Sequence, residues 1–376
     1  MTRRIAFYAP LKPPDHPIPS GDREIARLTM TALERAGYDV ALASRFISYQ
    51  KRPSEPDFEA RRIDGTAEAA RLIEGWQAAP DAERPDLWLT YHPYCKAPDW
   101  LGPAASRALV IPYLTVEACR TRQNTDADWA RGRAVVQAAI RHAAINFCLK
   151  PSDRAYLQDV LPSMESVVPL APFMDLGALP PLPQKKMSPD GPLIVTAGMM
   201  RPGKKERCFL MLADALKQIA GEPWRLVVIG DGPARPLIER AFSGFEASRI
   251  EWTGAIDHGD VIGWLDRADL FAWPGYREPI GMVYLEAAAR GLPVAAFDSL
   301  GVPLVVRHGE TGLLVPEGDI AAYAEALRRL LRDPELRSCL GRAGLTKVRA
   351  EHDLSTASTT MRMAIEQLFT EPVARR

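Results

Sequence analysis

Short apolar runs alternate with helical patterns along most of the chain. The apolar runs, rich in Val, Ile and Leu, lack the polar alternation of a half-exposed strand and are typical of strands covered on both faces. Such strands and helices in alternation predict parallel sheets with helices on both faces. Before residue 179 we expect strands at residues 4–8, 39–43, 86–90, 108–113 and 144–148, and helices at 22–36, 67–77 and 129–142. After residue 192 we expect strands at 193–197, 224–230, 250–253, 270–273 and 293–297, and helices at 208–219, 258–266, 282–290 and 320–331.

A proline-rich segment separates the two series. Residues 179–192 contain five prolines, which indicates a stiff, extended linker. We therefore expect a first domain over residues 1–178, a second over residues 193–350, and a C-terminal helical segment over residues 351–376. The predicted class is α/β, with two Rossmann-like, doubly wound domains that face a central cleft. Ligands of such sheets bind at the carboxyl ends of the strands.

Composition narrows the classes of partner. The 376 residues include 47 Lys and Arg and 47 Asp and Glu, so the formal net charge is zero. The two signs are also equal in number on each side of residue 178. Nucleic-acid binding requires an excess of basic residues, so we expect no nucleic-acid partner. Five scattered cysteines without a C-x-x-C pair predict neither a zinc site nor a disulfide, and they indicate a reducing compartment.

The chain offers no membrane-spanning segment. No apolar run approaches the roughly 20 residues that cross a bilayer, and residues 5–9 are too short for the core of a signal peptide. We expect a cytoplasmic protein, at most peripheral at the inner membrane face, as a monomer or homodimer. Residues 131–142 form a helical pattern with a basic, partly apolar face. Packing on the sheet and weak contact with anionic lipid are the two hypotheses for that face.

Residues 273–293 are the most informative stretch, because a strand, a turn rich in Gly and Pro, and a helix follow one another there. Free backbone N–H groups at the helix start would bind an anion such as a diphosphate. These groups belong to Gly281, Met282 and Val283. Glu286 lies about 7.5 Å further along the helix at 1.5 Å per residue, where it could accept both hydroxyls of a ribose. Glu278, in the turn, would meet sugar hydroxyls at the other end of a bound nucleotide sugar. The alternative is that both glutamates are ordinary solvated residues.

Seven residues separate Glu278 from Glu286. Glu-Ala-x-Ala-x-Gly-x-Pro-Val then begins at Glu286, and Gly-x-x-Gly-Leu-Leu-Val begins at Gly309. This pattern resembles the E-x7-E region of family 4 of the retaining glycosyltransferases, which have the GT-B fold. The resemblance, with gaps, covers residues 20–366. It implies transfer of a hexose from a nucleoside-diphosphate sugar with retention, as in polysaccharide biosynthesis, without a metal or other cofactor. It also implies that the C-terminal helix returns to the first domain.

Two glycines of the second half fit the same family. Gly230 begins a Gly-Asp-Gly-Pro turn after a strand, and Gly254 lies in a segment similar to the loop that approaches the nucleotide base. A glycine pair such as Gly230-x-Gly232 also begins the dinucleotide fingerprint of dehydrogenases. Arg235 stands at the third glycine position of that fingerprint, which argues against it.

The phosphate loop of the family corresponds to residues 197–205. Met199 stands where the family usually has Arg, and Lys205 where it usually has Gly. The diphosphate still requires a guanidinium and an ammonium, which shifted positions could supply. The candidates are Arg201 and Lys205, with Lys204 close behind; a solvated loop is the alternative.

In the first domain, Gly21 and Asp22 stand where the family has a Gly-rich loop near donor phosphate and acceptor. Gly21 would let a ligand approach the backbone, whereas Asp22 could simply cap the following helix. His92 follows the strand at 86–90 and would lie at the rim of the cleft, in either a catalytic or a structural role. Family members commonly carry a second cleft histidine after the next strand, and Glu117 replaces it here.

Asp126 and Asp128 match the D-x-D metal motif of the other large glycosyltransferase fold. They stand just before a helix, where acidic residues favour the N-terminus, so we expect no metal site there. A helix start with Arg201 and Lys205 could stabilise the departing diphosphate instead. The resemblance implies that this phosphate helps to deprotonate the acceptor. A nucleotide-sugar epimerase of the same fold, a non-catalytic nucleotide-sugar-binding protein and a dehydrogenase are the alternatives.

Overall fold

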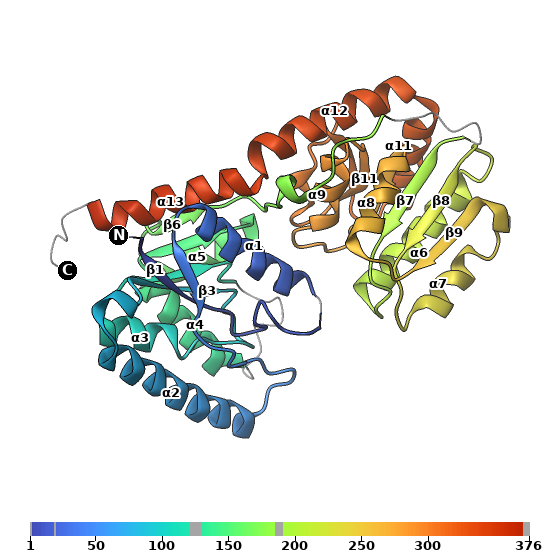
Figure 1. Ribbon diagram of the computed structural model, residues 1–376. Coiled ribbons are helices and arrows are strands. Elements are labelled where there is room, and N and C mark those ends of the chain that lie inside the picture. The colour runs from blue at the N-terminus through green and yellow to red at the C-terminus, as the bar shows by residue number, and fades with distance from the viewer. Residues whose placement is uncertain (1, 19, 120–128, 185–190, 371–376) are drawn as a thin grey trace. The chain divides into compact units, whose positions relative to one another are not determined.

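The computed structural model describes residues 2–18, 20–119, 129–184 and 191–370. It divides the chain into two compact units, of which the first comprises Met1–Ala171 with Leu354–Arg376 and the second Pro172–Asp353 (Figure 1). Each unit contains one six-stranded sheet in which all paired neighbours are parallel, with helices packed on it. The prediction of two α/β domains with parallel sheets is therefore confirmed.

The sheet of the first unit has the order β2-β1-β3-β4-β5-β6. The strand order reverses between β1 and β3, and ligands of open α/β sheets bind beside the carboxyl ends of strands at such a switch point. The strands are β1 (Arg4–Tyr8), β2 (Asp39–Leu42), β3 (Leu87–Tyr91), β4 (Tyr113–Val116), β5 (Ile145–Cys148) and β6 (Val167–Pro169). The helices are α1 (Gly21–Arg35), α2 (Glu55–Ala78), α3 (Gly102–Leu109), α4 (Ala130–His142), α5 (Pro151–Val160) and α13 (Leu354–Thr370).

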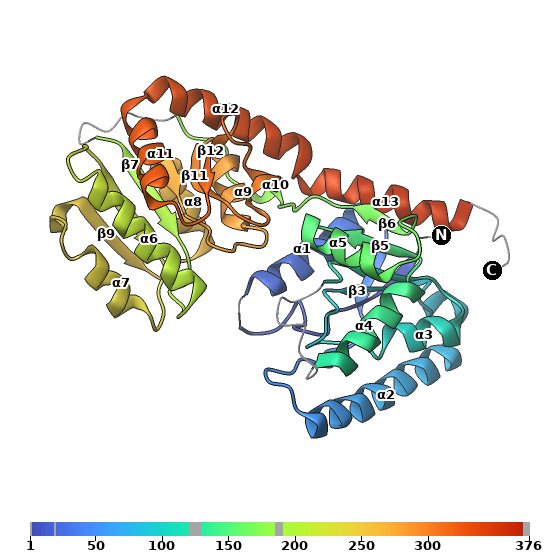
Figure 2. The same cartoon turned by 180° about the vertical axis from the view of Figure 1, so that it is seen from behind.

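The C-terminal helix α13 belongs to the first unit, where it packs along α1 (Figure 1, Figure 2). Glu366 of α13 accepts hydrogen bonds from Arg3 Nη1 at 2.7 Å and from Tyr38 Oη at 2.9 Å. These bonds connect the end of the chain to residues on both sides of α1.

The sheet of the second unit has the order β12-β11-β10-β7-β8-β9, with its switch point between β7 and β10. Val195, Phe271 and Ala295 in its central strands are fully buried, as expected for strands covered on both faces. The strands are β7 (Leu193–Ala197), β8 (Arg225–Ile229), β9 (Ile250–Gly254), β10 (Leu270–Ala272), β11 (Val294–Asp298) and β12 (Gly312–Pro316). The helices are α6 (Lys204–Gln218), α7 (Arg235–Phe242), α8 (His258–Arg267), α9 (Met282–Ala289), α10 (Val302–Val305), α11 (Ile320–Arg332) and α12 (Pro334–Glu351).

One predicted strand was wrong, and one predicted helix begins earlier than expected. Residues 108–113 are not a strand, because α3 continues to Leu109 and Val110 ends it in a left-handed conformation, with β4 beginning only at Tyr113. The helix expected at 67–77 is the second half of α2, which begins at Glu55. Ser54 caps that helix by accepting a hydrogen bond from Asp57 N, a start signal that the apolar pattern does not contain.

The unit boundary also lies earlier than expected. The second unit begins at Pro172, whereas residues 179–192 were expected to separate the domains. Met174 is buried in the core of the second unit, and its N–H donates to the carbonyl of His352 at 3.0 Å. Packing of Met174 therefore assigns the residues before the prolines to this unit.

Candidate functional site

The candidate donor-binding residues of the second unit gather around its switch point. The loop after β7 begins at Gly198 and leads into α6, and the loop after β10 begins at Trp273 and leads into α9. Because β7 and β10 are neighbours and parallel, their two loops leave the sheet at the same edge. The first loop and the start of α6 contain Arg201, Lys204 and Lys205, and the second loop and the start of α9 contain Glu278, Gly281, Met282 and Val283.

Lys205 and Glu278 meet at this edge. Lys205 Nζ donates to Glu278 Oε2 at 2.7 Å, and the ammonium lies 5.2 Å from the centre of the Trp273 ring. The Lys205 side chain is 33% exposed and that of Glu278 13%. A cation and a carboxylate are thus held side by side where a ligand from solvent can reach both.

Arg201 and Lys204 lie beside this pair and are exposed. Within the described part of the chain, neither side chain has a hydrogen-bond or ion-pair partner. Gly203 precedes α6 with φ 97° and leaves the helix start without a side-chain cap. The structure therefore places these three candidate cations near the start of α6, and of the three Lys205 has a hydrogen-bond partner among the described residues.

Glu286 lies on the second turn of α9, and its side chain is 23% exposed. His258, the first residue of α8, approaches it with Nε2 3.3 Å from Glu286 Oε1. Sequence reasoning missed His258, because no motif connects it to a glutamate that follows 28 residues later. The start of α9 has no side-chain cap, as an anion site at Gly281, Met282 and Val283 requires.

The fold itself explains why glycine stands at two of the candidate positions in the second unit. Gly281 has φ 75°, and a Cβ there would lie 2.4 Å from the ring of Tyr284. Gly230 has φ 130°, and a Cβ there would lie 2.0 Å from the carbonyl oxygen of Gly198. Gly254, with φ 70°, accepts a backbone hydrogen bond from Gly230 at 2.9 Å. The fold alone thus requires Gly281 and Gly230, so their presence is no independent sign of a ligand.

In the first unit, His92 and Glu117 meet at the carboxyl edge of the sheet. His92 follows β3 and Glu117 follows β4, and His92 Nδ1 lies 3.3 Å from Glu117 Oε2. Both have left-handed backbones, with φ 54° and 55°. Tyr91 Oη donates to the same Glu117 oxygen at 3.0 Å, and His92 Nε2 lies 3.7 Å from Cys119 Sγ.

Lys150, which sequence reasoning missed, completes this group. It follows β5, and its ammonium donates to Glu117 Oε1 and lies 2.9 Å from Asp153 Oδ2. Burial favours the neutral form of Glu117, but Lys150 and His92 outweigh it and hold the pKa of that carboxyl well below its usual range. Glu117 stands where a second cleft histidine was expected, and the structure ties it into this buried pair. A lysine at a strand end carries no motif, so only the topology shows its role.

Gly21 and Asp22 open α1, near this group. Ser20, not Asp22, caps the helix, since its hydroxyl accepts from Arg23 N at 3.3 Å. A Cβ on Gly21 would meet nothing within 4 Å, so the fold does not require glycine there. Burial, then the charges of Glu117 and Asp22, raise the pKa of Tyr91 well above its ordinary value, which places Asp22 within electrostatic reach of the His92 group.

Two further candidates are the D-x-D pair and the basic helix face. Asp126 and Asp128 lie outside the described residues. In the part of the chain that the structure describes, no three His, Cys, Asp or Glu side chains are grouped as metal ligands would be. Arg131, on the basic face considered for lipid contact, pairs with Glu55 and Glu59, which neutralise its charge. None of the helices in the described ranges is long and apolar enough to cross a membrane.

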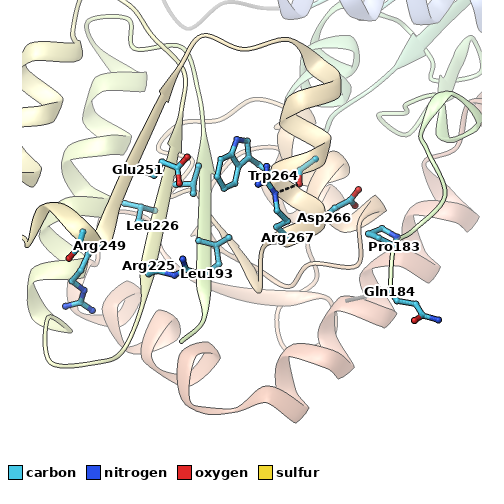
Figure 3. A pocket seen from close by; sticks show the side chains of 13 residues that line it. Pro183, Gln184, Leu193, Arg225, Leu226, Arg249, Glu251, Trp264, Asp266 and Arg267 are labelled. Atoms are coloured by element: carbon cyan, nitrogen blue, oxygen red, sulfur yellow. Dashed lines mark hydrogen bonds between the residues drawn. The ribbon is translucent and has the colours of Figure 1, made fainter. Parts of the chain in front are cut away.

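A cavity of about 860 Å³ lies at the opposite edge of the second sheet, near the amino ends of β7, β8 and β9 (Figure 3). Arg249 and Arg267 line it. Arg249 donates to three backbone carbonyls and packs on Trp224, and Arg267 lies over Trp264. None of the candidate site residues lines this cavity, so it is separate from the switch-point site.

Residues 191–333 match the family model described as glycosyl transferases group 1. Sulfoquinovosyl transferase SQD2 of Arabidopsis thaliana is 30% identical over 177 residues, which cover 46% of this chain and 33% of that protein. The D-inositol 3-phosphate glycosyltransferase of Jonesia denitrificans is 32% identical over 223 residues, which cover 54% and 52%. The chain thus spans about a third to a half of the length of these curated relatives.

Solved structures match over nearly the whole chain. Sucrose-phosphate synthase from Thermosynechococcus elongatus has a TM-score of 0.71 at 22% identity and covers 98% of this chain and 99% of its own. Anabaena Alr3699/HepE in complex with UDP-glucose has a TM-score of 0.68 at 17% identity and covers 98% and 100%. This likeness shows the fold class, a two-domain α/β fold of the GT-B type.

Proposed function

We propose that this protein is a retaining glycosyltransferase that moves a hexose from a nucleoside-diphosphate sugar to an acceptor. The observation that carries the proposal is the ion pair between Lys205 and Glu278 beside the uncapped start of α9. A cation for phosphate and a carboxylate for sugar hydroxyls thus stand together at the switch point of a doubly wound sheet. Glu286 on α9 adds a carboxylate for the ribose.

In this reaction the bond between the anomeric carbon and the diphosphate oxygen breaks, and negative charge develops on the departing phosphate. The backbone N–H groups at the start of α9, together with Lys205, Arg201 and Lys204, stabilise that charge. Glu278 accepts hydrogen bonds from the transferred sugar. The acceptor oxygen bonds to the anomeric carbon from the same face, and its proton passes to the departing phosphate. These cations supply the electrostatic stabilisation, so the proposal requires no metal.

The comparisons support a nucleotide-sugar donor. The family model covers the segment from before β7 to the end of α11, which contains all of the switch-point residues. The relatives named above are glycosyltransferases, and Alr3699/HepE has been solved with UDP and with UDP-glucose. UDP-glucose is therefore the first donor to test. GDP- and ADP-sugars follow, because the contacts to the base are expected to come from the backbone.

The first unit carries the acceptor side of the proposed reaction, with Gly21, Asp22 and His92 at its sheet edge. The acceptor is a glycan, a lipid-linked glycan or a small molecule, as in polysaccharide biosynthesis, and the reaction takes place in the cytoplasm. A lipid-linked acceptor would bring the protein to the inner membrane face, although Arg131 is already neutralised by Glu55 and Glu59.

A thermal-shift screen against UDP-, GDP- and ADP-sugars, followed by a turnover assay with the donor that binds, tests the proposal. A ligand that binds only the folded protein raises its melting temperature. Lys205→Ala and Glu286→Ala should each reduce donor turnover strongly. Lys217→Ala, at the exposed far end of the same helix as Lys205, is the matched control. Near-normal turnover in both site variants would contradict the proposal.

The products separate the two alternatives that share this fold. A nucleotide-sugar epimerase would convert the donor in the absence of any acceptor and release no transferred sugar. A non-catalytic binding protein would show the thermal shift with neither hydrolysis nor transfer; the departure at Met199 and the engagement of Glu117 with Lys150 favour this second candidate.

A further inference from the structure

Backbone hydrogen bonds fix the positions of His92 and Glu117. His92 N donates to the carbonyl of Val116 at 2.8 Å, and Glu117 N donates to that of Phe147 at 3.0 Å. Each residue thus turns from the end of its own strand onto the next strand of the sheet. A left-handed backbone is unfavourable for residues with a Cβ, and such positions gather at functional sites. The two turns aim an imidazole and a carboxylate at one another.

Protein groups occupy both oxygens of the Glu117 carboxylate. Oε1 accepts from Lys150, and Oε2 faces Tyr91 Oη at 3.0 Å and His92 Nδ1 at 3.3 Å. Glu117 is 3% exposed, and the side chain of Lys150 is 10% exposed. A carboxylate this deeply buried remains charged only because cations neutralise it. The pair of Glu117 and Lys150 therefore presents one fixed negative oxygen to the ring of His92.

Among the described residues, the titratable groups around His92 come from several elements. Cys119 and Glu117 follow β4, Lys150 and Asp153 belong to the start of α5, Tyr91 and Tyr94 accompany His92 after β3, and Asp22 lies at the start of α1. The cation among these described groups is Lys150, which is paired with both Glu117 and Asp153. Burial lowers the pKa of His92, but Cys119 and Glu117 outweigh burial and raise it well above its ordinary value.

We propose that Glu117 and Lys150 are positioning residues: Lys150 holds the Glu117 carboxylate, which places one charged oxygen 3.3 Å from His92 Nδ1 and favours the protonated imidazole. The inference rests on the proposed transferase function. A cationic His92 cannot accept the proton of an acceptor hydroxyl, so that proton goes to the departing phosphate. In the proposed reaction a protonated His92 therefore serves as a hydrogen-bond donor and a positive charge and not as a base. This role gives a physical reason for a glutamate at position 117, where the family commonly has a second cleft histidine.

The protonation of His92 can be measured without any enzymatic activity. The chain has six histidines, and proton–carbon NMR of their C2 positions gives one titration curve each. We expect His92 to be the last to lose its proton, with a midpoint well above the 6.5 that is ordinary for histidine. Burial and Arg107 lower the pKa of His142, and burial and Lys347 lower that of His352, so these two should titrate before it. The His92 signal is the one missing from His92→Gln and shifted in Cys119→Ala.

Glu117→Gln tests the positioning role. Removing the fixed negative oxygen should lower the titration midpoint of His92 by more than about one pH unit. In the turnover assay, kcat/KM of this variant should then fall about tenfold between pH 6 and pH 8, since one pH unit corresponds to a tenfold change in protonation. The wild type should change little over that interval. Glu165→Gln, an exposed glutamate of the same unit, should leave the titration and the pH profile unchanged.

The titration and the pH profile test different parts of the inference. A His92 midpoint at or below pH 6.5 in the wild type would overturn the inference, whether or not the protein transfers sugar. That titration is made on the wild type, so it stands even if Glu117→Gln does not fold. A different result would contradict a catalytic use of the charge. In that result His92 titrates late in the wild type, but kcat/KM of Glu117→Gln does not fall as His92 loses its proton. Absence of any turnover would count against the proposed function and leave the titration as the test of the charge.

Discussion

Lys205 Nζ and Glu278 Oε2 lie 2.7 Å apart, although Lys205 belongs to the first turn of α6 and Glu278 to the loop after β10. The pair is partly exposed, so solvent screens it and its contribution to stability is small. It also lies against Trp273, whose ring excludes water from one side of the ammonium. The pair therefore fixes the position of both side chains while leaving them available to a ligand.

A double-mutant cycle on Lys205 and Glu278 should reveal this shared role. In the proposed reaction each group interacts with the donor, so we expect Lys205→Met and Glu278→Gln each to reduce kcat/KM by about a hundredfold. The double variant should lose less than the product of the two, because each single variant leaves an unpaired partner in the site. Melting temperatures should change little. A fully multiplicative loss in steady-state kinetics would show that the two side chains act independently.

Glu286 should discriminate ribose from deoxyribose. If its carboxylate accepts both ribose hydroxyls, the wild type should bind UDP more tightly than 2′-deoxy-UDP by about tenfold, because one hydrogen bond to a charged group is lost. Glu286→Gln should weaken UDP binding and remove most of this discrimination.

His258→Ala provides a second measurement of the same contact. His258 Nε2 lies 3.3 Å from Glu286 Oε1 and helps to orient the carboxylate, so removal of His258 should reduce the preference for ribose without abolishing binding. Titration calorimetry with the two nucleotides measures both variants. Equal affinity of the wild type for UDP and 2′-deoxy-UDP would exclude the ribose contact.

The sequence predicts the parallel sheets well because their strands are continuous apolar runs, a signal that burial on both faces makes strong. It misplaces β4 because Ala108 to Pro112 is equally apolar. Only the left-handed turn at Val110, which is 90% exposed, shows that α3 ends there. It also misses the first half of α2, where buried residues are sparse and the helix depends on its cap at Ser54.

The site residues also include some that the sequence predicts and some that it misses. Glu278, Glu286 and Lys205 stand in or near recognisable spacings, so the sequence alone singles them out. Lys150 and His258 come to the two sites from other strands and helices, and no spacing along the chain connects either to its glutamate. Such contacts follow from strand order, which the sequence pattern does not determine.

Gly281 and Gly21 form a matched pair for separating fold from function. Gly281→Ala places a Cβ at φ 75° and 2.4 Å from the ring of Tyr284, so we expect the free energy of unfolding to fall by about 2 kcal/mol or more. Gly21→Ala has open space around it and should melt as the wild type does.

The two glycines should also differ in kinetics. If a substrate approaches the backbone at Gly21, the Gly21→Ala variant should show a raised KM with an unchanged melting temperature. Denaturant unfolding and substrate-dependent rates measure the two effects. A stable Gly281→Ala variant would show that the loop at the start of α9 adapts to a side chain.

Asp153 should make the stability of the protein depend on pH in a defined direction. Burial raises the pKa of Asp153 from 3.8 to about 6, against the opposing effect of Lys150. The folded state therefore holds this proton more tightly than the unfolded chain does. The resulting stabilisation is complete below pH 3.8 and is lost as the pH rises through 6.

Asp153→Asn cannot ionise and should therefore gain stability relative to the wild type between about pH 4 and pH 7, with no further change above that range. Lys150 keeps Glu117 as its partner in this variant, so the ammonium is not left uncompensated. Urea unfolding at pH 4.5, 6 and 7.5 gives the difference in free energy at each pH. Asp64→Asn, at an exposed position of α2, should give about the same difference at all three. A difference that instead turns against Asp153→Asn as the pH rises would mean that attraction to Lys150 outweighs burial, and that the folded protein holds Asp153 as a carboxylate.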